Sequence, residues 1–379
     1  MKAFSNLLNH VHEYNLCSKC GGCVSFCTAM DYGALELDED GYPRFKDENR
    51  CIDCGICYMI CPETTDLYED AKNMIHWEEP AGGIISTNIF RATNQDILSN
   101  ATNGGAVTAI LMHLMHSGLI DAAVISRQQG LFSRTPSLAT SSSDLLESCG
   151  SFFDTSHGMV LYSEYYPALT SSVQSSLEDV KNFGSSRVAF VGTPCQISTL
   201  RKMQALEVVP SDCIYLMLGL FCSGNFALND RAKKRLEKIG GFNWDNVKKV
   251  DIKDKLYICL KDGLIHIMPL EELDFVMRPA CKYCRDYTAE FADLSFGGIG
   301  SDEGWTTVIA RTQTGLDVLK KAEGDTLEAF NSQGSKSGLA GNDNKISKAL
   351  HAVLKQAELK KDRASRNREE HITPVNTQA

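Results

Sequence analysis

The chain has 379 residues, a formal net charge of −10 at pH 7, 43% hydrophobic residues and 23% charged residues. This length corresponds to about two or three domains, and the composition supplies enough apolar residues for a core. The acidic charge, without any block of Lys or Arg, argues against a nucleic-acid-binding protein, which needs cations to neutralise phosphates.

The N-terminal segment lacks the apolar stretch of about 7–15 residues that marks a signal peptide. The longest strictly apolar run, residues 213–218, is far shorter than the ~20 residues of a membrane span. We therefore expect a cytoplasmic protein that does not itself insert into a membrane.

Fifteen cysteines are present, and eight of them fall in two matched runs within residues 17–61. A secreted disulfide scaffold would be short and would spread its cysteines along the chain, so these runs indicate metal ligation in a reducing cytosol instead. The runs are Cys17-x2-Cys20-x2-Cys23-x3-Cys27 and Cys51-x2-Cys54-x2-Cys57-x3-Cys61-Pro62. This is the spacing of bacterial ferredoxins, in which the fourth cysteine of each run ligates the cluster of the other run.

The spacing therefore predicts two [4Fe-4S] clusters, the first held by Cys17, Cys20, Cys23 and Cys61 and the second by Cys51, Cys54, Cys57 and Cys27. Two-residue gaps allow a tight loop to place three thiolates around one cluster, and Gly21, Gly22 and Gly55 permit the turns. The alternative is zinc, which also takes four-cysteine sites built from C-x2-C pairs but rarely uses two four-cysteine runs. Between the runs, residues 34–37 and 42–45 predict a small hairpin around Asp40-Gly41.

After a linker over residues 63–85, alternating apolar residues predict a strand that begins near Ile84. Asn100-Ala-Thr-Asn-Gly-Gly105 then precedes an expected helix over residues 106–117 and an expected strand over residues 122–126. A Gly-Gly turn that opens a helix presents free N–H groups and the positive end of the helix dipole to a phosphate or an electron-rich ring. The alternative is that Gly104 and Gly105 merely form a turn.

Strands expected at residues 187–191 and 214–220 are separated by a helix that begins at Ile197, which favours an α/β core. Ligands in such cores lie beyond the carboxyl ends of the strands, which is where Cys195 and Cys222 are placed. Residues 247–252, 257–260 and 265–268 predict a meander of short strands.

Cys281-x2-Cys284 follows the meander. Together with Cys195 and Cys222 this pair could complete a third [4Fe-4S] cluster, while a zinc site and ordinary buried cysteines are the alternatives. Cys213 and Cys259 lie in or beside apolar strands and are expected to be packing residues, and Cys149 has no ligand-like setting either.

Phe296-Gly-Gly-Ile-Gly300 with Gly304 resembles a dinucleotide-binding fingerprint, but a strand is expected at residues 305–312, where that fingerprint needs a helix. We therefore expect no classical nicotinamide site. Beyond it, residues 331–344 are rich in Gly, Ser and Asn and predict a flexible loop. Residues 346–366 predict a peripheral or partner-facing helix, followed by a disordered end from Ile372.

The chain resembles the coenzyme F420 hydrogenase/dehydrogenase beta-subunit family over roughly residues 85–320. The motifs that carry the resemblance occur in the family's order and are Asn103-Gly-Gly-Ala-Val-Thr108, Gly192-Thr-Pro-Cys-Gln196, Gly219-Leu-Phe-Cys222, Cys281-Lys-Tyr-Cys284-Arg-Asp-Tyr287, Phe291-Ala-Asp293, Gly297 to Gly300, and Gly304-Trp305 to Arg311-Thr312. The preceding cysteine runs are similar to the domain found in the input subunit of the F420H2 dehydrogenases.

With the expected elements, the resemblance implies an α+β and α/β protein of three parts. These are a bacterial-ferredoxin-like domain over residues 1–78, a mixed α/β flavin-binding domain over residues 79–320, and a loop and helical tail over residues 321–379. The family binds FAD beside a [4Fe-4S] cluster, which implies that Cys195, Cys222, Cys281 and Cys284 hold a third cluster. It also implies that Asn103, Gly104, Gly105 and Thr108 lie against the flavin, with Thr193 nearby.

Two segments depart from the family pattern. Gly150-Ser-Phe-Phe153 has Phe152 where the family often has a basic residue, which puts the identity of the hydride donor in question. Ser223-Gly-Asn-Phe226 differs from the expected Met-Glu-Ser-Phe type.

The resemblance implies an oxidoreductase subunit that exchanges a hydride between coenzyme F420 and FAD and passes single electrons through [4Fe-4S] clusters to other subunits of a redox complex. Reduced deazaflavin gives up a hydride and clusters move single electrons, so a flavin that does both must connect them. No side chain need act as a general acid or base, and His12, His113, His116 and His157 are expected to be structural or surface residues. The alternatives are an adaptor of a heterodisulfide-reductase-like or formate-dehydrogenase-like complex, or the same fold with NAD(P)H or ferredoxin as donor.

Overall fold

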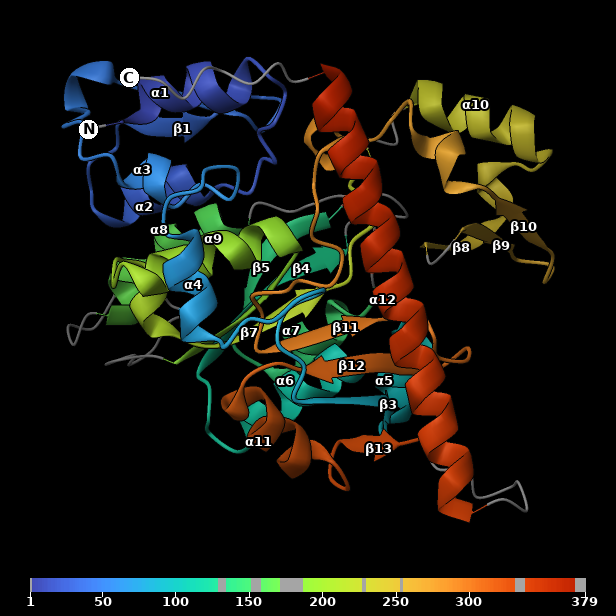
Figure 1. Ribbon diagram of the computed structural model, residues 1–379. Coiled ribbons are helices and arrows are strands. Elements are labelled where there is room, and N and C mark those ends of the chain that lie inside the picture. Colours follow the sequence, from blue (N-terminus) through green and yellow to red (C-terminus); the bar gives the residue numbers. More distant parts are fainter. Residues whose placement is uncertain are drawn as a thin grey trace.

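The computed structural model describes residues 2–128, 134–150, 158–170, 187–226, 230–252, 255–330 and 338–371. The N-terminal part is a small α+β unit that contains both cysteine runs (Figure 1). Its elements are α1 (Phe4–Leu7), a π-helical turn (Leu8–His12), α2 (Gly22–Ala29), β1 (Leu35–Leu37), β2 (Pro43–Phe45), a 3₁₀ turn (Glu48–Arg50), α3 (Ile56–Met59) and α4 (Tyr68–Met74).

The turns of this unit follow from the sequence. Each cysteine run enters a helix through a glycine in the left-handed region, Gly21 (φ 84°) before α2 and Gly55 (φ 76°) before α3. A side chain would be strained at both positions. The predicted hairpin is confirmed, because β1 and β2 pair antiparallel with Leu35 opposite Phe45.

An eight-stranded mixed sheet forms the centre of the larger part, in the order β13-β3-β12-β11-β7-β6-β4-β5. Its strands are β3 (Ser86–Ala92), β4 (Ala122–Gln128), β5 (Arg134–Ala139), β6 (Val188–Gly192), β7 (Ile214–Leu220), β11 (Leu294–Gly297), β12 (Thr306–Ala310) and β13 (Leu327–Ala329). The central strands β4, β6, β7 and β11 are parallel. The flanking strands pair antiparallel with their neighbours. The expected mixed α/β class is confirmed, and the antiparallel edges are an addition that the sequence did not indicate.

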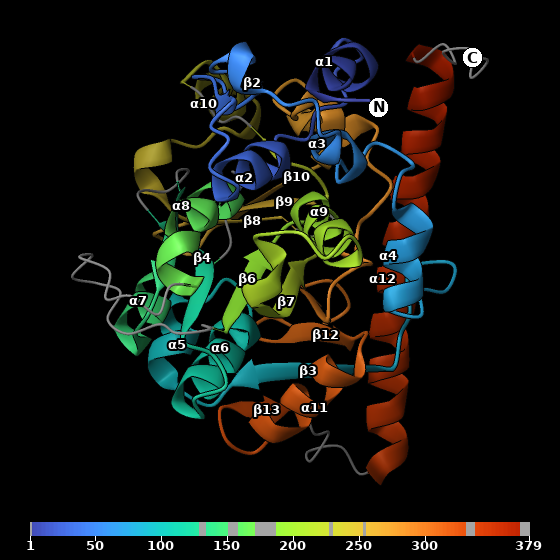
Figure 2. The same cartoon turned by 90° about the vertical axis from the view of Figure 1, so that its left-hand side faces the viewer.

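Helices cover both faces of this sheet, because successive strand residues point to opposite sides. Ala123 and Ile125 of β4 face a core formed with α5, α6, α7 and α11, whereas Ala122 and Val124 face a core formed with α8 and α9. Figure 2 shows the molecule from the side of α8 and α9. The bounds are α5 (Gln95–Asn100), α6 (Ala106–His116), α7 (Ser142–Glu147), α8 (Gly158–Thr170), α9 (Pro194–Ala205) and α11 (Gln313–Ala322).

The predicted meander is confirmed as a separate three-stranded antiparallel sheet of β8 (Val247–Ile252), β9 (Leu256–Leu260) and β10 (Ile265–Met268). Together with α10 (Asp230–Gly240) it encloses a small core around Leu236 and Ile258. Short 3₁₀ turns lie at Ser211–Cys213, Trp244–Asn246, Leu270–Leu273 and Pro279–Lys282.

The C-terminal helix α12 (Gly338–His371) runs along one side of the molecule, from the level of β13 to the level of the N-terminal unit (Figures 1 and 2). The prediction of a helix at the periphery is confirmed, but its start was wrong and one of its faces is buried. It begins within the segment expected to be a loop, and Ala349, Val353 and Ala364 are fully buried. Its Lys360 and Arg363 side chains donate to backbone carbonyls of the protein, as described below. The expected disordered end from Ile372 lies outside the described residues.

Candidate functional site

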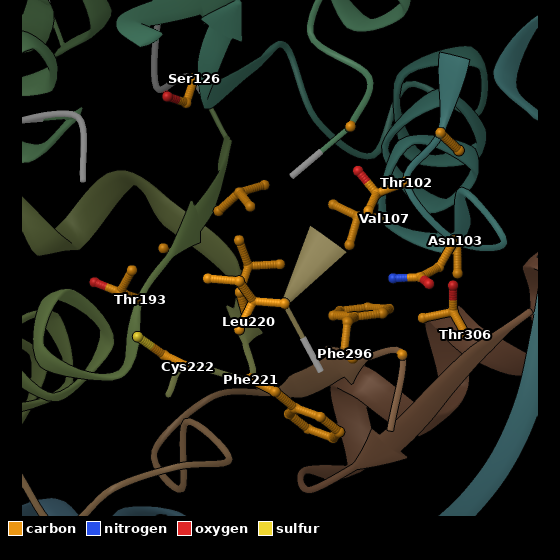
Figure 3. A pocket seen from close by; sticks show the side chains of 18 of the residues that line it. Thr102, Asn103, Val107, Ser126, Thr193, Leu220, Phe221, Cys222, Phe296 and Thr306 are labelled. Atoms are coloured by element: carbon orange, nitrogen blue, oxygen red, sulfur yellow. The ribbon is translucent and has the colours of Figure 1, made fainter. Parts of the chain in front are cut away.

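A cavity of about 270 Å³ lies at the carboxyl ends of the parallel strands β4, β6, β7 and β11 (Figure 3). This is the edge at which ligands bind in open α/β sheets, and the volume is close to the lower end of the ~300–1,000 Å³ of small-molecule sites. Residues that follow three of these strands border it directly, namely Thr193 after β6, Cys222 after β7 and Gly298 after β11.

Four of the five residues expected against a flavin line this cavity: Asn103, Gly105, Thr108 and Thr193. Gly105 has a φ of 70° and starts α6, so the first residues of that helix border the cavity as well. Gly104 does not line it. Its N–H donates to Thr306 Oγ1 at 3.0 Å, and a Cβ at this position would lie 2.6 Å from the Phe90 carbonyl oxygen. Gly104 therefore permits close packing behind the cavity wall.

The cavity wall combines apolar side chains with a few polar groups. Val107, Leu220 and Phe296 supply apolar surface (Figure 3). The buried Ser126 hydroxyl has no hydrogen-bond partner among the described residues, so it is available to a ligand. Burial lowers the pKa of Arg134 to about 10, which leaves this lining residue cationic at neutral pH. Apolar surface beside a cation and a free hydroxyl suits a ring system that carries phosphates, as FAD does.

Neither Ser126 nor Arg134 was identified from the sequence. Ser126 could have been found, because it ends an expected strand and so lies at the ligand-binding edge. Nothing in the sequence distinguishes Arg134 from the other arginines.

The first cysteine set, Cys17, Cys20, Cys23 and Cys61, surrounds one small cavity between the two cysteine runs. Burial, followed by the thiols of Cys20 and Cys17, raises the pKa of Cys23 well above the ordinary value. Burial and then the Cys20 thiol do the same for Cys61. The structure thus brings the fourth cysteine of the second run to the first three of the other run, as the ferredoxin spacing predicts.

The second cysteine set consists of Cys51, Cys54, Cys57 and Cys27. Burial raises the pKa of Cys57 to about 12, and the neighbouring thiols of Cys54, Cys51 and Cys27 contribute to this increase. Between Cys51 and Cys54, Ile52 and Asp53 are exposed, whereas the corresponding residues Ser18 and Lys19 of the first run are partly buried. Of the two sets in the N-terminal unit, this one is nearer the surface.

The third cysteine set, Cys195, Cys222, Cys281 and Cys284, is assembled from distant segments. Cys195 lies in the first turn of α9 and Cys222 follows β7, while Cys281 lies in the 3₁₀ turn Pro279–Lys282 and Cys284 follows that turn. Burial raises the pKa of Cys195, Cys222 and Cys284 to about 12, and each of them also interacts with the Cys281 thiol. The N–H of Asn225 donates to Cys281 Sγ at 3.3 Å.

Thiols are the donors that iron–sulfur clusters use, so each of the three sets has the chemistry that a [4Fe-4S] cluster requires. Cysteine ligands of a cluster are deprotonated, so binding must release protons from thiols such as Cys23 and Cys61, whose pKa is raised by burial. In the described part of the chain no three His, Cys, Asp or Glu side chains gather as tightly as a single metal ion would require.

The sites adjoin one another. Cys222 belongs to the third set and also lines the large cavity. Thr199 of α9 connects the third set to the first, because its hydroxyl lies 3.4 Å from Cys20 Sγ and donates to the Cys195 carbonyl oxygen at 3.0 Å. Cys57 of the second set borders the small cavity of the first. The order is therefore cavity, third set, first set, second set.

The remaining candidates have structural settings. Cys149 donates to Thr108 Oγ1 at 3.5 Å and to the Leu145 carbonyl, and Cys213 is buried in the core beneath α8 and α9. His113 pairs with Asp325 and His116 bonds to Ser142. His12 packs edge-on against Phe4. Phe152 and His157 lie outside the described residues, whereas Ser223, Gly224 and Asn225 of the other departing segment line the cavity.

Two buried lysines beside the cysteine sets were missed from the sequence. They are Lys202 of α9 and Lys360 of α12, and each donates to the backbone carbonyl of a candidate cluster cysteine.

None of the helices in the described part of the chain combines the length and the apolar character that a membrane span requires.

Comparison with known families agrees with this architecture. The N-terminal and C-terminal profiles of the family described as coenzyme F420 hydrogenase/dehydrogenase, beta subunit, match residues 89–162 and 185–332. A 4Fe-4S dicluster domain matches residues 9–62, which confirms the ferredoxin-like prediction for the cysteine runs.

Individual proteins give the same result. An uncharacterised protein of Methanocaldococcus jannaschii is 30% identical, with 97% of this chain and 99% of that protein covered. The coenzyme F420 hydrogenase subunit beta of Methanothermobacter thermautotrophicus is 31% identical, with 61% of this chain and 79% of that subunit covered.

Among solved structures, a chain of the F420-reducing [NiFe] hydrogenase complex of Methanosarcina barkeri superposes with a TM-score of 0.61 at 25% identity, with 78% of this chain and 94% of that chain covered. The cavity at the strand ends, the cysteine sets and these similarities lead to one conclusion. The chain belongs to the coenzyme F420 hydrogenase/dehydrogenase beta-subunit family.

Proposed function

We propose that this chain is an F420-linked oxidoreductase subunit that exchanges a hydride between coenzyme F420 and FAD and relays single electrons through three [4Fe-4S] clusters to a partner protein. Relatives that are named as subunits of F420-dependent complexes support the substrate and the existence of a partner. The observation that carries the proposal is the continuity of the sites, from the large cavity through the third and first cysteine sets to the second.

FAD would occupy the large cavity. Asn103, Gly105, Thr108 and Thr193 would border it, and Arg134 would place a cation near its phosphates. When bound, FAD supplies the exchange between a two-electron hydride and single electrons, and the clusters supply one-electron transfer. The apolar wall, with Val107, Leu220 and Phe296, excludes water from the cavity interior.

The cysteines would hold the clusters in the sets described above. Thr199 keeps the third and first sets adjacent, because its hydroxyl contacts Cys20 while its own helix carries Cys195. The second set, whose loop between Cys51 and Cys54 is exposed, is then the place at which a partner would take or supply electrons.

We further propose that residues 1–78 form the unit of the first two clusters and residues 79–320 the flavin and third-cluster unit. The helix α12, within residues 321–379, is functionally part of the second unit, since Lys360 and Arg363 donate to carbonyls of Cys222 and Ser223.

The test is anaerobic stopped-flow spectroscopy of the purified, iron-reconstituted full chain with F420H2 and, separately, with NADH. We expect bound flavin, about twelve irons per chain, and rapid bleaching of the flavin and cluster bands with F420H2 alone. Intact flavin and clusters that bleach with neither donor would contradict the F420 reaction and favour an electron-transfer adaptor. Bleaching with NADH would identify a different donor on the same fold.

A further inference from the structure

Two lysines are buried beside the candidate clusters, and each donates to two backbone carbonyl oxygens, one of which belongs to a candidate cluster cysteine. Lys202 of α9 is fully buried, and its Nζ donates to the carbonyl oxygens of Cys61 (2.7 Å) and Thr64 (2.8 Å). Lys360 of α12 is 6% exposed, and its Nζ donates to the carbonyl oxygens of Cys222 (2.6 Å) and Asp286 (2.8 Å). Each lysine therefore holds the backbone of one cluster cysteine.

A buried ammonium needs compensating negative charge, since carbonyl dipoles alone replace only part of its hydration. The groups around Lys360 that carry negative charge once a cluster is bound are the sulfurs of Cys284, Cys222 and Cys281, together with Asp286. Around Lys202 they are Cys61, Asp66, Glu63 and Cys20. In both places cluster ligands make up much of the available counter-charge.

We infer that Lys360 and Lys202 are positioning residues that balance the negative charge of the third and first clusters, respectively, and so raise their reduction potentials. This inference rests on the proposed function, because it presupposes clusters at these cysteine sets. A four-thiolate cluster gains a negative charge on reduction, and a fixed cation in a water-poor site stabilises the more negative state. Neither lysine contacts the large cavity, so neither acts on the flavin directly.

The two lysines lie on different elements and serve different sets, so each is a control for the other. Lys355, which is exposed on α12, is the matched control for a change of charge on the same helix. Lys360→Gln removes the charge but keeps an N–H donor, whereas Lys360→Arg keeps the charge in a larger group.

The experiment is a redox titration of the reconstituted full chain, monitored by electron paramagnetic resonance, for wild type and for Lys360→Gln, Lys360→Arg, Lys202→Gln and Lys355→Gln. The signal that disappears in Cys222→Ser identifies the third cluster, and the signal that disappears in Cys20→Ser identifies the first. We expect Lys360→Gln to shift only the third-cluster midpoint to a more negative potential and Lys202→Gln to shift only that of the first. Lys360→Arg and Lys355→Gln should stay near wild type.

Unchanged potentials in both glutamine variants would overturn the inference. If Lys360→Gln instead loses the third cluster, retention in Lys360→Arg supports the need for charge, whereas loss in both variants shows that only the shape of the lysine matters. A wild-type protein with about eight irons lacks the third cluster, which refutes that part of the proposed function before any lysine variant is compared.

Discussion

The two cysteine runs of the N-terminal unit and the third cysteine set place similar ligands by different means. The runs occupy residues 17–61, and a glycine in the left-handed region brings each into its helix. The third set takes its thiols from a helix start, a strand end and a 3₁₀ turn, and Lys360 reaches it from a helix 138 residues beyond Cys222. A local spacing determines the first arrangement, while the second exists only once the sheet and α12 have assembled.

The largest expected effect separates these two arrangements directly. Cys222→Ser should remove the third cluster and reduce the iron content from about twelve to about eight per chain, with the ferredoxin clusters retained. The reason is that Cys222 lies far outside residues 17–61, whose own eight cysteines would hold the two ferredoxin clusters. Iron analysis together with paramagnetic resonance checks this, with Cys259→Ser as the control. Unchanged iron in Cys222→Ser would remove Cys222 from the ligand set.

What the sequence predicts follows the same division. It predicts the pairing of the cysteine runs, the hairpin and the strand ends at Thr193 and Cys222. Each of these depends on the spacing of cysteines or on the periodicity of apolar residues over a short segment. It does not predict the buried face of α12, the contacts of Lys202 and Lys360, or the place of Arg134 at the cavity. Those depend on which distant segments meet. Gly104 shows a further limit, since the motif is correct but this glycine serves packing rather than the cavity.

The second prediction concerns the pH dependence of the free energy of unfolding. The surroundings of the third set should contribute more to it than the two cysteine runs do. Glu290 is buried, accepts a hydrogen bond from Trp77 Nε1 (3.0 Å) and pairs with Lys361 (3.1 Å). Burial, followed by the neighbouring Asp286 carboxylate, raises its pKa from 4.5 to about 7. The folded state then holds a proton that the unfolded state releases. The free energy of unfolding should therefore fall as pH rises from about 4.5 to about 7, by about 3 kcal/mol at most for this group.

Glu290→Gln should flatten that dependence, and denaturant titrations between pH 5.5 and 7.5 measure it. The exposed Glu271→Gln serves as the control. The same slope in wild type and Glu290→Gln would show that Glu290 does not carry the retained proton.

The third prediction addresses the contact between α2 of the N-terminal unit and α9, the helix that carries Cys195. A Cβ at Gly22 of α2 would lie 2.2 Å from Thr199 Cγ2 on α9. Gly22→Ala should therefore lower the free energy of unfolding by about 1–3 kcal/mol, as overpacking does, despite the better helix propensity of alanine. Thr199→Ser removes the clashing methyl group and keeps the hydroxyl beside Cys20, so the double variant should recover most of the loss. No recovery in denaturant titrations would show that the strain lies elsewhere.

The smallest expected effect tests whether place in the fold, rather than the presence of cysteine, decides which thiols bind iron. Cys213 and Cys222 lie at opposite ends of the same strand, since Cys213 precedes Ile214 and Cys222 follows Leu220 of β7. The strand between them has 7 residues and is about 23 Å long. Burial raises the pKa of Cys213 to about 11, so its thiol is neutral at pH 7 and packs in the core beneath α8 and α9. Cys213→Ala should leave the iron content and all three potentials unchanged and lower the free energy of unfolding by only about 1 kcal/mol. Loss of iron would mean that the amino-terminal edge of the sheet also holds a cluster, and the carboxyl-end rule that places Cys195 and Cys222 would no longer explain their selection.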